Sequence, residues 1–205
     1  MRSFRPLAFA LVGGLLVGAA GSLLAEDIDL AATIDSAKAN VQAKKYAHAL
    51  TDLQTAIAEV TRLRAESLKS LFPDAPAGWT AGDAEAQENN GFAAMVTGTI
   101  VKRTYTKGDS RLTLELTVGS PAYAMMQQML TNPMYANAGM KQVTVKGHRG
   151  TLELNAENKH ATLNLLLNSA GAILKIEGDG VVRDDVEKTF GGAFDFDKAE
   201  KLVSE

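Results

Sequence analysis

The apolar residues of this chain change their period near Gly91, and that change limits the fold to one that combines helices with strands. Before Gly91 they recur at every third or fourth position, as they do along one face of a helix. After it they alternate with polar residues between glycine-containing turns, which is typical of strands with one buried face. No strand-helix-strand alternation repeats along the chain, so we expect an antiparallel sheet. The sequence therefore predicts an α+β fold.

Residues 26–72 are predicted to form a helical hairpin. The apolar positions of its first helix are Leu30, Ile34, Ala37 and Val41, and those of its second helix are Leu50, Leu53, Ile57, Val60 and Leu68. The polar residues Lys44 and Lys45 separate the two runs. Pro73 cannot continue the second helix, because proline lacks the amide hydrogen that the helical ladder needs. We expect residues 73–91, which contain prolines, glycines and acidic residues, to be a linker loop.

Residues 92–205 are predicted to form the main domain, an antiparallel sheet of about six strands with helices packed on it. Alternating or β-branched stretches predict strands near 95–105, 112–118, 143–145, 152–154, 163–167 and 174–176. Pro121 begins a predicted helix that runs to Leu130, and the spacing of Val182, Val186 and Phe190 predicts a closing helix. The chain has no cysteine, so its stability must come from a packed core without disulfides.

Residues 1–25 have the layout of a secretory signal peptide. Arg2 and Arg5 precede twenty uncharged residues from Pro6 to Ala25, and small residues crowd the end of that run. We expect cleavage after Ala25, with sites a few residues earlier as alternatives, and a periplasmic or secreted protein without stable membrane insertion. An uncleaved anchor is the other interpretation, because about 20 apolar residues suffice to cross a bilayer.

Composition and motifs argue against several functional classes. Removal of Arg2 and Arg5 leaves 19 basic against 24 acidic residues, a net charge of −5 in place of −3, which does not favour nucleic acid as a partner. There is no nucleophile elbow, no phosphate-binding glycine loop and no cysteine ligand. The three histidines, His48, His148 and His160, show no metal-binding spacing. We expect no enzyme and no cofactor, although acidic residues converging from distant loops would leave no signature in a sequence.

Methionine is concentrated in one segment. Met125, Met126, Met129, Met134 and Met140 are five of the seven methionines of the chain. Packing of flexible thioethers between a helix and a twisted sheet is the preferred explanation. One alternative is a Cu(I) site formed by Met125, Met126 and Met129, which a helix can place on one face, because soft sulfur ligands select Cu(I). The other is an adaptable groove for a peptide or a lipid.

Two stretches of the sequence carry family resemblances. Tyr46, Ala49 and Ala56 occupy matching positions of the second helix of a tetratricopeptide repeat, which this hairpin resembles. The run from Phe72 to Trp79 (FPDAPAGW), followed at the end of the sheet by Ile176-Glu177-Gly178 before a closing helix, resembles the Mog1/PsbP-like group of exported bacterial proteins. That resemblance implies an α/β/α sandwich and a role as a binding or assembly accessory.

The function predicted from these observations is that of an exported, non-enzymatic binding or assembly accessory whose partner is another envelope protein. The alternative is a carrier of Cu(I) or a small ligand. Irregular segments on a rigid scaffold often carry the contacts, so the expected binding rim consists of Tyr123, Met125, Met126, Met129, Met134, Tyr135 and Trp79. For Trp79 the alternative is a structural role at the edge of the core.

Overall fold

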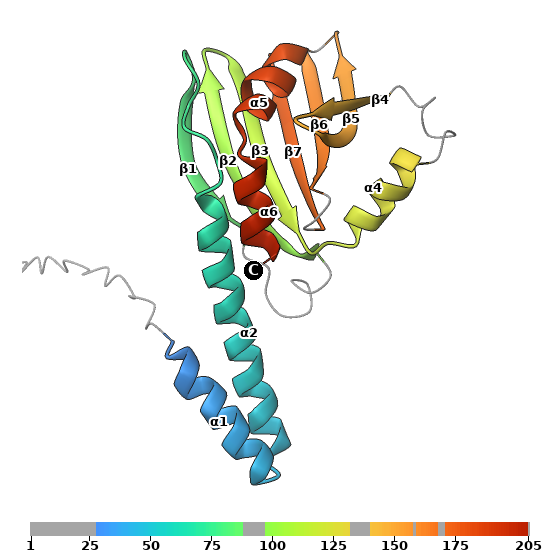
Figure 1. The fold of residues 1–205 in the computed structure, drawn as a ribbon. Coiled ribbons are helices and arrows are strands. Elements are labelled where there is room, and N and C mark those ends of the chain that lie inside the picture. The colour runs from blue at the N-terminus through green and yellow to red at the C-terminus, as the bar shows by residue number, and fades with distance from the viewer. Residues whose placement is uncertain (1–27, 88–96, 132–139, 158, 168–170, 205) are drawn as a thin grey trace, which may run out of the picture.

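The computed structural model of the 205-residue chain describes residues 28–87, 97–131, 140–157, 159–167 and 171–204. It confirms the α+β class and the antiparallel sheet (Figure 1). The sheet has the order β1-β2-β3-β7-β6-β5-β4, and every neighbouring pair is antiparallel. The strands are β1 (Thr80–Ala86), β2 (Thr99–Lys107), β3 (Ser110–Val118), β4 (Lys141–Val145), β5 (His148–Asn155), β6 (His160–Leu167) and β7 (Ala172–Asp179).

The sheet has seven strands, so the prediction of about six was wrong by one. The additional strand is β1, which lies within the segment predicted to be a linker loop. Its sequence, TAGDAEA, has no large apolar residue, and its register with β2 is interrupted between Ala81 and Ala84. An edge strand of this kind is held by backbone hydrogen bonds to its one neighbouring strand. Its sequence shows no alternation of apolar and polar residues from which a strand could be predicted.

Helices are present where the spacings predict them, but the closing segment is a π-helical turn that begins after Val182, which is 60% exposed. The described helices are α1 (Leu30–Gln42), α2 (Tyr46–Lys69), α4 (Ala122–Thr131), the π-helical turn η2 (Asp185–Phe190), α5 (Gly191–Ala193) and α6 (Phe196–Ser204). The Asp29 carboxylate caps α1 by accepting the Ala32 amide at 3.0 Å. Between α1 and α2 the turn passes through Lys44, whose φ is 56°. The two helices of the predicted hairpin are therefore present, with the turn at the expected lysines.

One face of the sheet forms the core. Alternate residues of the central strands point to it and are fully buried, as Leu114, Leu163 and Leu174 illustrate. The last turns of α2 cover this face together with η2, α5 and α6 (Figure 1). Phe190 on η2 lies at the centre, where its ring meets Tyr105 at a centroid distance of 4.7 Å and Trp79 at 5.1 Å.

The opposite face of the sheet is largely polar. Lys102, Glu115 and Lys175 lie side by side in register across β2, β3 and β7. At one corner α4 packs on this face, where Gln142 and Arg149 donate hydrogen bonds to the carbonyl of Leu130 at 3.2 and 3.3 Å. Helices thus contact both faces of the sheet, but they cover them unequally.

Tyr105 ties β2 to the segment that follows α2. Its hydroxyl donates a 2.7 Å hydrogen bond to the carbonyl of Pro73, and its side chain is fully buried. Burial raises the pKa of Tyr105 to about 12, because the phenolate would lose its hydration. The folded state therefore binds this proton more tightly than the unfolded state, whose tyrosine titrates near 10. The contribution of the protonated Tyr105 to the free energy of unfolding is therefore fully present below pH 10, and it is lost as the pH rises toward 12.

We expect the absorbance of one phenolate at 295 nm to appear only near pH 12 in the wild type. Tyr105→Phe removes that step, so the difference between the two titrations isolates Tyr105 among the four tyrosines of the chain. Urea unfolding followed from pH 8 to 11.5 is expected to show a fall in unfolding free energy above pH 10 that the variant lacks. Equal titration curves for both proteins would contradict the assignment.

Candidate functional site

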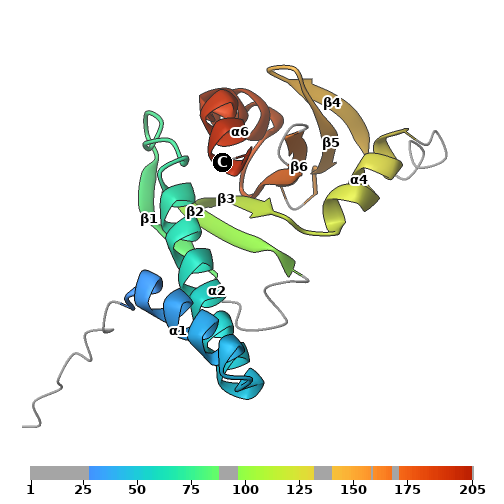
Figure 2. The ribbon, with the colours of Figure 1, turned by 60° about the horizontal axis from the view of Figure 1, so that its bottom comes forward.

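The hairpin of α1 and α2 projects from the sheet (Figures 1 and 2). Only the C-terminal part of α2 enters the core, through Ala65 and Leu68, and Arg64 reaches the carbonyl of Val203 on α6 at 3.4 Å. The preceding turns of α2 run beside α1 and beyond the edge of the sheet. This part of the molecule therefore has few neighbours among the described residues that could cover it.

Small and polar residues make the contact between α1 and α2. Ala37, Ala49 and Ala56 are buried between the helices. Along one flank of the contact, the Asp52 carboxylate accepts hydrogen bonds from Ser36 at 2.8 Å and from Asn40 at 2.9 Å. The large apolar side chains of both helices are thus left outside the contact that joins them.

These side chains form one exposed surface, which we call the hairpin face. It consists of Ile34 and Val41 on α1 and Tyr46, Leu50, Leu53, Ile57 and Val60 on α2, and each of the seven is 42–61% exposed. Nine of the twelve exposed large hydrophobic residues among those described lie between Ile28 and Leu63. Exposed apolar area is therefore concentrated on the hairpin and is not scattered over the molecule, as single surface hydrophobics ordinarily are.

The two apolar stripes lie on the same side of the hairpin. On α1, the apolar stripe lies on one side of the buried Ala37, and Ser36 and Asn40 lie on the other side. On α2, the apolar stripe and Asp52 likewise lie on opposite sides of the buried alanines. Because the helices are antiparallel, this arrangement places both stripes on one side, with the hydrogen-bonded flank on the other. The hairpin face is therefore continuous across both helices.

Charge on α2 is kept away from the hairpin face. Glu59 is buried on another side of the helix, where its carboxylate accepts hydrogen bonds from the Arg62 guanidinium at 2.9 and 2.7 Å. These hydrogen bonds hold the pKa of Glu59 below its ordinary value, so the carboxylate stays ionised and paired. Glu59 therefore adds no charge to the hairpin face, whose border on α1 carries the exposed Lys38.

The methionine segment is only partly brought together. On α4, Met126 and Met129 are half-buried, whereas Met125 is 72% exposed. Tyr123 is half-buried on the side of Met126. Met134 and Tyr135 lie outside the described residues. The helical spacing of Met125, Met126 and Met129 is present in α4, but their exposure differs, and the Cu(I) hypothesis stays a prediction.

Trp79 does not belong to a rim with α4. Its side chain is buried on the core face and packs edge-on against Phe190, with the Lys107 ammonium 5.8 Å from the centre of its ring. It enters the sheet at β1, whereas α4 packs on the opposite face near β5 and β6. The structural alternative for Trp79 fits this position, in which the indole closes one edge of the core.

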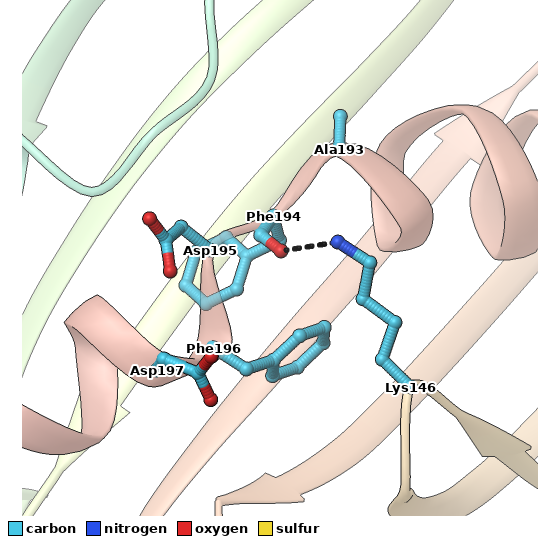
Figure 3. Close-up of a pocket in the computed structure, with 6 residues that line it drawn as sticks. All are labelled: Lys146, Ala193, Phe194, Asp195, Phe196 and Asp197. Carbon is cyan, nitrogen blue, oxygen red and sulfur yellow. Dashed lines mark hydrogen bonds between the residues drawn. The ribbon is translucent and has the colours of Figure 1, made fainter.

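A hollow of about 350 Å³ lies between the β4–β5 turn and the junction of α5 with α6 (Figure 3). The ammonium of Lys146 donates a hydrogen bond to the carbonyl of Phe194 at 3.3 Å. The side chains of Phe194 and Phe196 form the apolar wall of the hollow. The Asp195 carboxylate caps α6 through the Lys198 amide at 3.0 Å. Lys146 forms no ion pair with Asp195 or Asp197 among the described residues, so the hollow does not pair an acid with a base.

His148 and His160 make structural contacts, whereas His48 is exposed on α2. His148 stacks on Phe196 at a centroid distance of 4.2 Å, and His160 lies between Asp179 at 2.8 Å and Glu177 at 3.4 Å on the polar face. Within the described ranges, no three histidine, aspartate or glutamate side chains are grouped so that they could hold a metal ion. The hairpin face is thus the most extensive candidate site that the described residues form.

Comparison with known proteins adds no family to this description. No protein-family model, no curated protein and no solved structure matches the chain. None of the described helices combines the length and the apolar character that crossing a membrane requires.

Proposed function

We propose that this chain is a non-enzymatic binding or assembly accessory of the bacterial cell envelope, and that it holds a protein chain on its hairpin face. The observation that carries the proposal is the group of seven large apolar side chains on a hairpin that projects from the sheet. Burial of apolar area is the main favourable contribution to protein association. A contiguous apolar patch of several hundred Å² is uncommon on a monomer without an interaction role.

Further features support the other parts of the proposal. The charge pattern of residues 1–25 supports export, which makes another envelope protein the partner class. Structural contacts account for His148 and His160, which supports a function without catalysis or a cofactor. In the same proposal, α4 on one face of the sheet and α2, α5 and α6 on the other form an incomplete α/β/α sandwich, the architecture that the Mog1/PsbP-like resemblance implies.

Photo-crosslinking in the host of this protein tests the proposal. A benzophenone amino acid is placed at Leu50 on the hairpin face, at Met125 on α4, or at Val182, which is 60% exposed and remote from both. We expect an adduct with a protein chain from position 50 and none from position 182. An adduct from position 125 alone would move the interaction to the methionine segment, and the absence of adducts from position 50 would refute the proposal.

A further inference from the structure

We propose that a second copy of this chain occupies the hairpin face, in a two-fold symmetric dimer whose two hairpins pack into a four-helix bundle. This inference rests on the proposed function of the hairpin face as a protein-binding surface, and it names the chain that is bound. Four properties of the described residues favour a second copy: the spacing of the apolar residues, their area, the charge around them and their place in the fold.

The spacing on α2 is that of a helix-packing seam. Tyr46, Leu50, Leu53, Ile57 and Val60 follow one another at intervals of four, three, four and three residues. This is the heptad alternation in which side chains of one helix insert between those of another. Within its own hairpin, α2 meets α1 through Ala49 and Ala56 on a neighbouring side, so the heptad side chains have none of the described helices opposite them. A second hairpin supplies such helices.

The area matches that of a stable interface. The seven residues are about half-exposed, and together they present roughly 700 Å² of surface. A specific protein interface of ordinary size buries about 800 Å² on each partner. A two-fold dimer brings the same patch from each copy together, so the whole face is buried by one contact.

The charge pattern permits contact between identical surfaces. The chain is acidic, which by itself opposes self-association. On α2, however, the residues at the outer border of the stripe are Ala47, Gln54 and Thr61, and all three are uncharged. Two copies can therefore meet along the stripe of α2 without placing like charges opposite each other there, and Lys38 on α1 lies at the border of the hairpin face. The polar face of the sheet carries Lys102, Glu115 and Lys175 in register and offers no comparable apolar surface.

The position in the fold leaves room for the second copy. The hairpin face spans α1 and the part of α2 that runs beyond the sheet, and both stretches of helix project from the sheet (Figure 2). Two hairpins can overlap along this part while the two sheets stay apart. A partner on the core face of the sheet would have to displace α5 or α6 before it could pair with it.

Light scattering and sedimentation equilibrium of the purified, host-processed protein test the inference. We expect twice the mass of one chain. We expect the double variant Leu50→Gln/Ile57→Gln to raise the dimer dissociation constant by at least about a hundredfold, because four apolar side chains per dimer are lost from the interface. The matched control Leu154→Gln/Val182→Gln makes the same kind of change at exposed residues outside the hairpin, and it is expected to stay dimeric.

A second measurement does not depend on the folding of the glutamine variants. Because the chain has no cysteine, Leu50→Cys introduces a single thiol and keeps an apolar side chain at the seam. We expect the reaction of this thiol with a maleimide to slow as protein concentration rises, while a thiol from Val182→Cys reacts at a constant rate.

The possible outcomes separate this inference from the proposed function. A monomer at every concentration, or a dimer that the Leu50→Gln/Ile57→Gln variant leaves intact, overturns the inference. A monomer in solution together with an adduct from position 50 to a different protein in cells overturns the second copy but supports the proposed function. A monomer without any adduct from position 50 overturns both.

Discussion

Replacing Phe190 by alanine is expected to lower the free energy of unfolding by about 3–5 kcal/mol, the range for large-to-small changes of aromatic residues in a core. Phe190 is fully buried, and its ring lies 4.7 Å from that of Tyr105 and 5.1 Å from that of Trp79. The cavity left by the ring cannot be filled by moving one neighbour, because the two aromatic partners are held by different elements. Trp79 precedes β1, and Tyr105 is hydrogen-bonded to Pro73.

Urea unfolding followed by the fluorescence of Trp79, the single tryptophan of the chain, measures this loss directly. Phe190→Leu keeps much of the volume and is expected to lose less than about half as much. Val182→Ala changes a residue that is 60% exposed just ahead of η2 and is expected to shift stability by no more than about 0.5 kcal/mol. A loss below about 1 kcal/mol for Phe190→Ala would show that this ring is not the centre of the core.

Gly150→Ala is expected to destabilise the protein by more than about 3 kcal/mol, through steric overlap within the sheet. A Cβ atom at Gly150 on β5 would lie 1.8 Å from the carbonyl oxygen of Asn164 and 3.0 Å from the Cα of Leu165. Both atoms belong to the backbone of β6, so no side-chain rotation can relieve the overlap. The two strands would have to separate at this point, with loss of the hydrogen bonds that join β5 to the sheet.

Gly192→Ala provides the matched control, because its Cβ would have no heavy atom within 4 Å. This substitution lies in α5 and is expected to be neutral or to stabilise slightly, since alanine restricts the unfolded chain more than glycine does. Thermal and urea unfolding of both variants give the comparison. Equal stability of the two would mean that β5 and β6 do not approach as closely at Gly150 as the structure has them.

Much of the fold could be predicted from the sequence, because burial on one face leaves a periodic pattern. The spacing of Leu30, Ile34 and Val41 predicted α1, and the alternation of leucines in β3 predicted both that strand and its buried face. The strand β1 could not be predicted in this way. Its residues are small or acidic, it has a neighbour on one side only, and its place in the sheet depends on pairing with a segment more than a dozen residues away.

The candidate site was harder to predict than the fold. All residues of the hairpin face except Tyr46 were recognised from the sequence as apolar positions of two helices, without a prediction of what packs against them. A pattern shows which residues share a face, but it does not show what packs against that face. Here Ala37, Ala49 and the hydrogen bonds of Asp52 make the contact between the helices, and this leaves the larger residues outside it. The methionine cluster drew attention because its composition is unusual, which says nothing of its exposure.

The length of α2 has a mechanical consequence. From Tyr46 to Ala65 the helix is continuous, and at 1.5 Å per residue that stretch measures about 30 Å. A single helix with no break resists bending, and its last turns are clamped between the sheet and α6. It therefore behaves as a lever arm whose base is fixed in the core. A partner bound to the hairpin face is therefore held at a fixed distance and direction from the sheet. A force applied to that partner is transmitted through α2 to β1 and β2, the strands that contact the base of the helix.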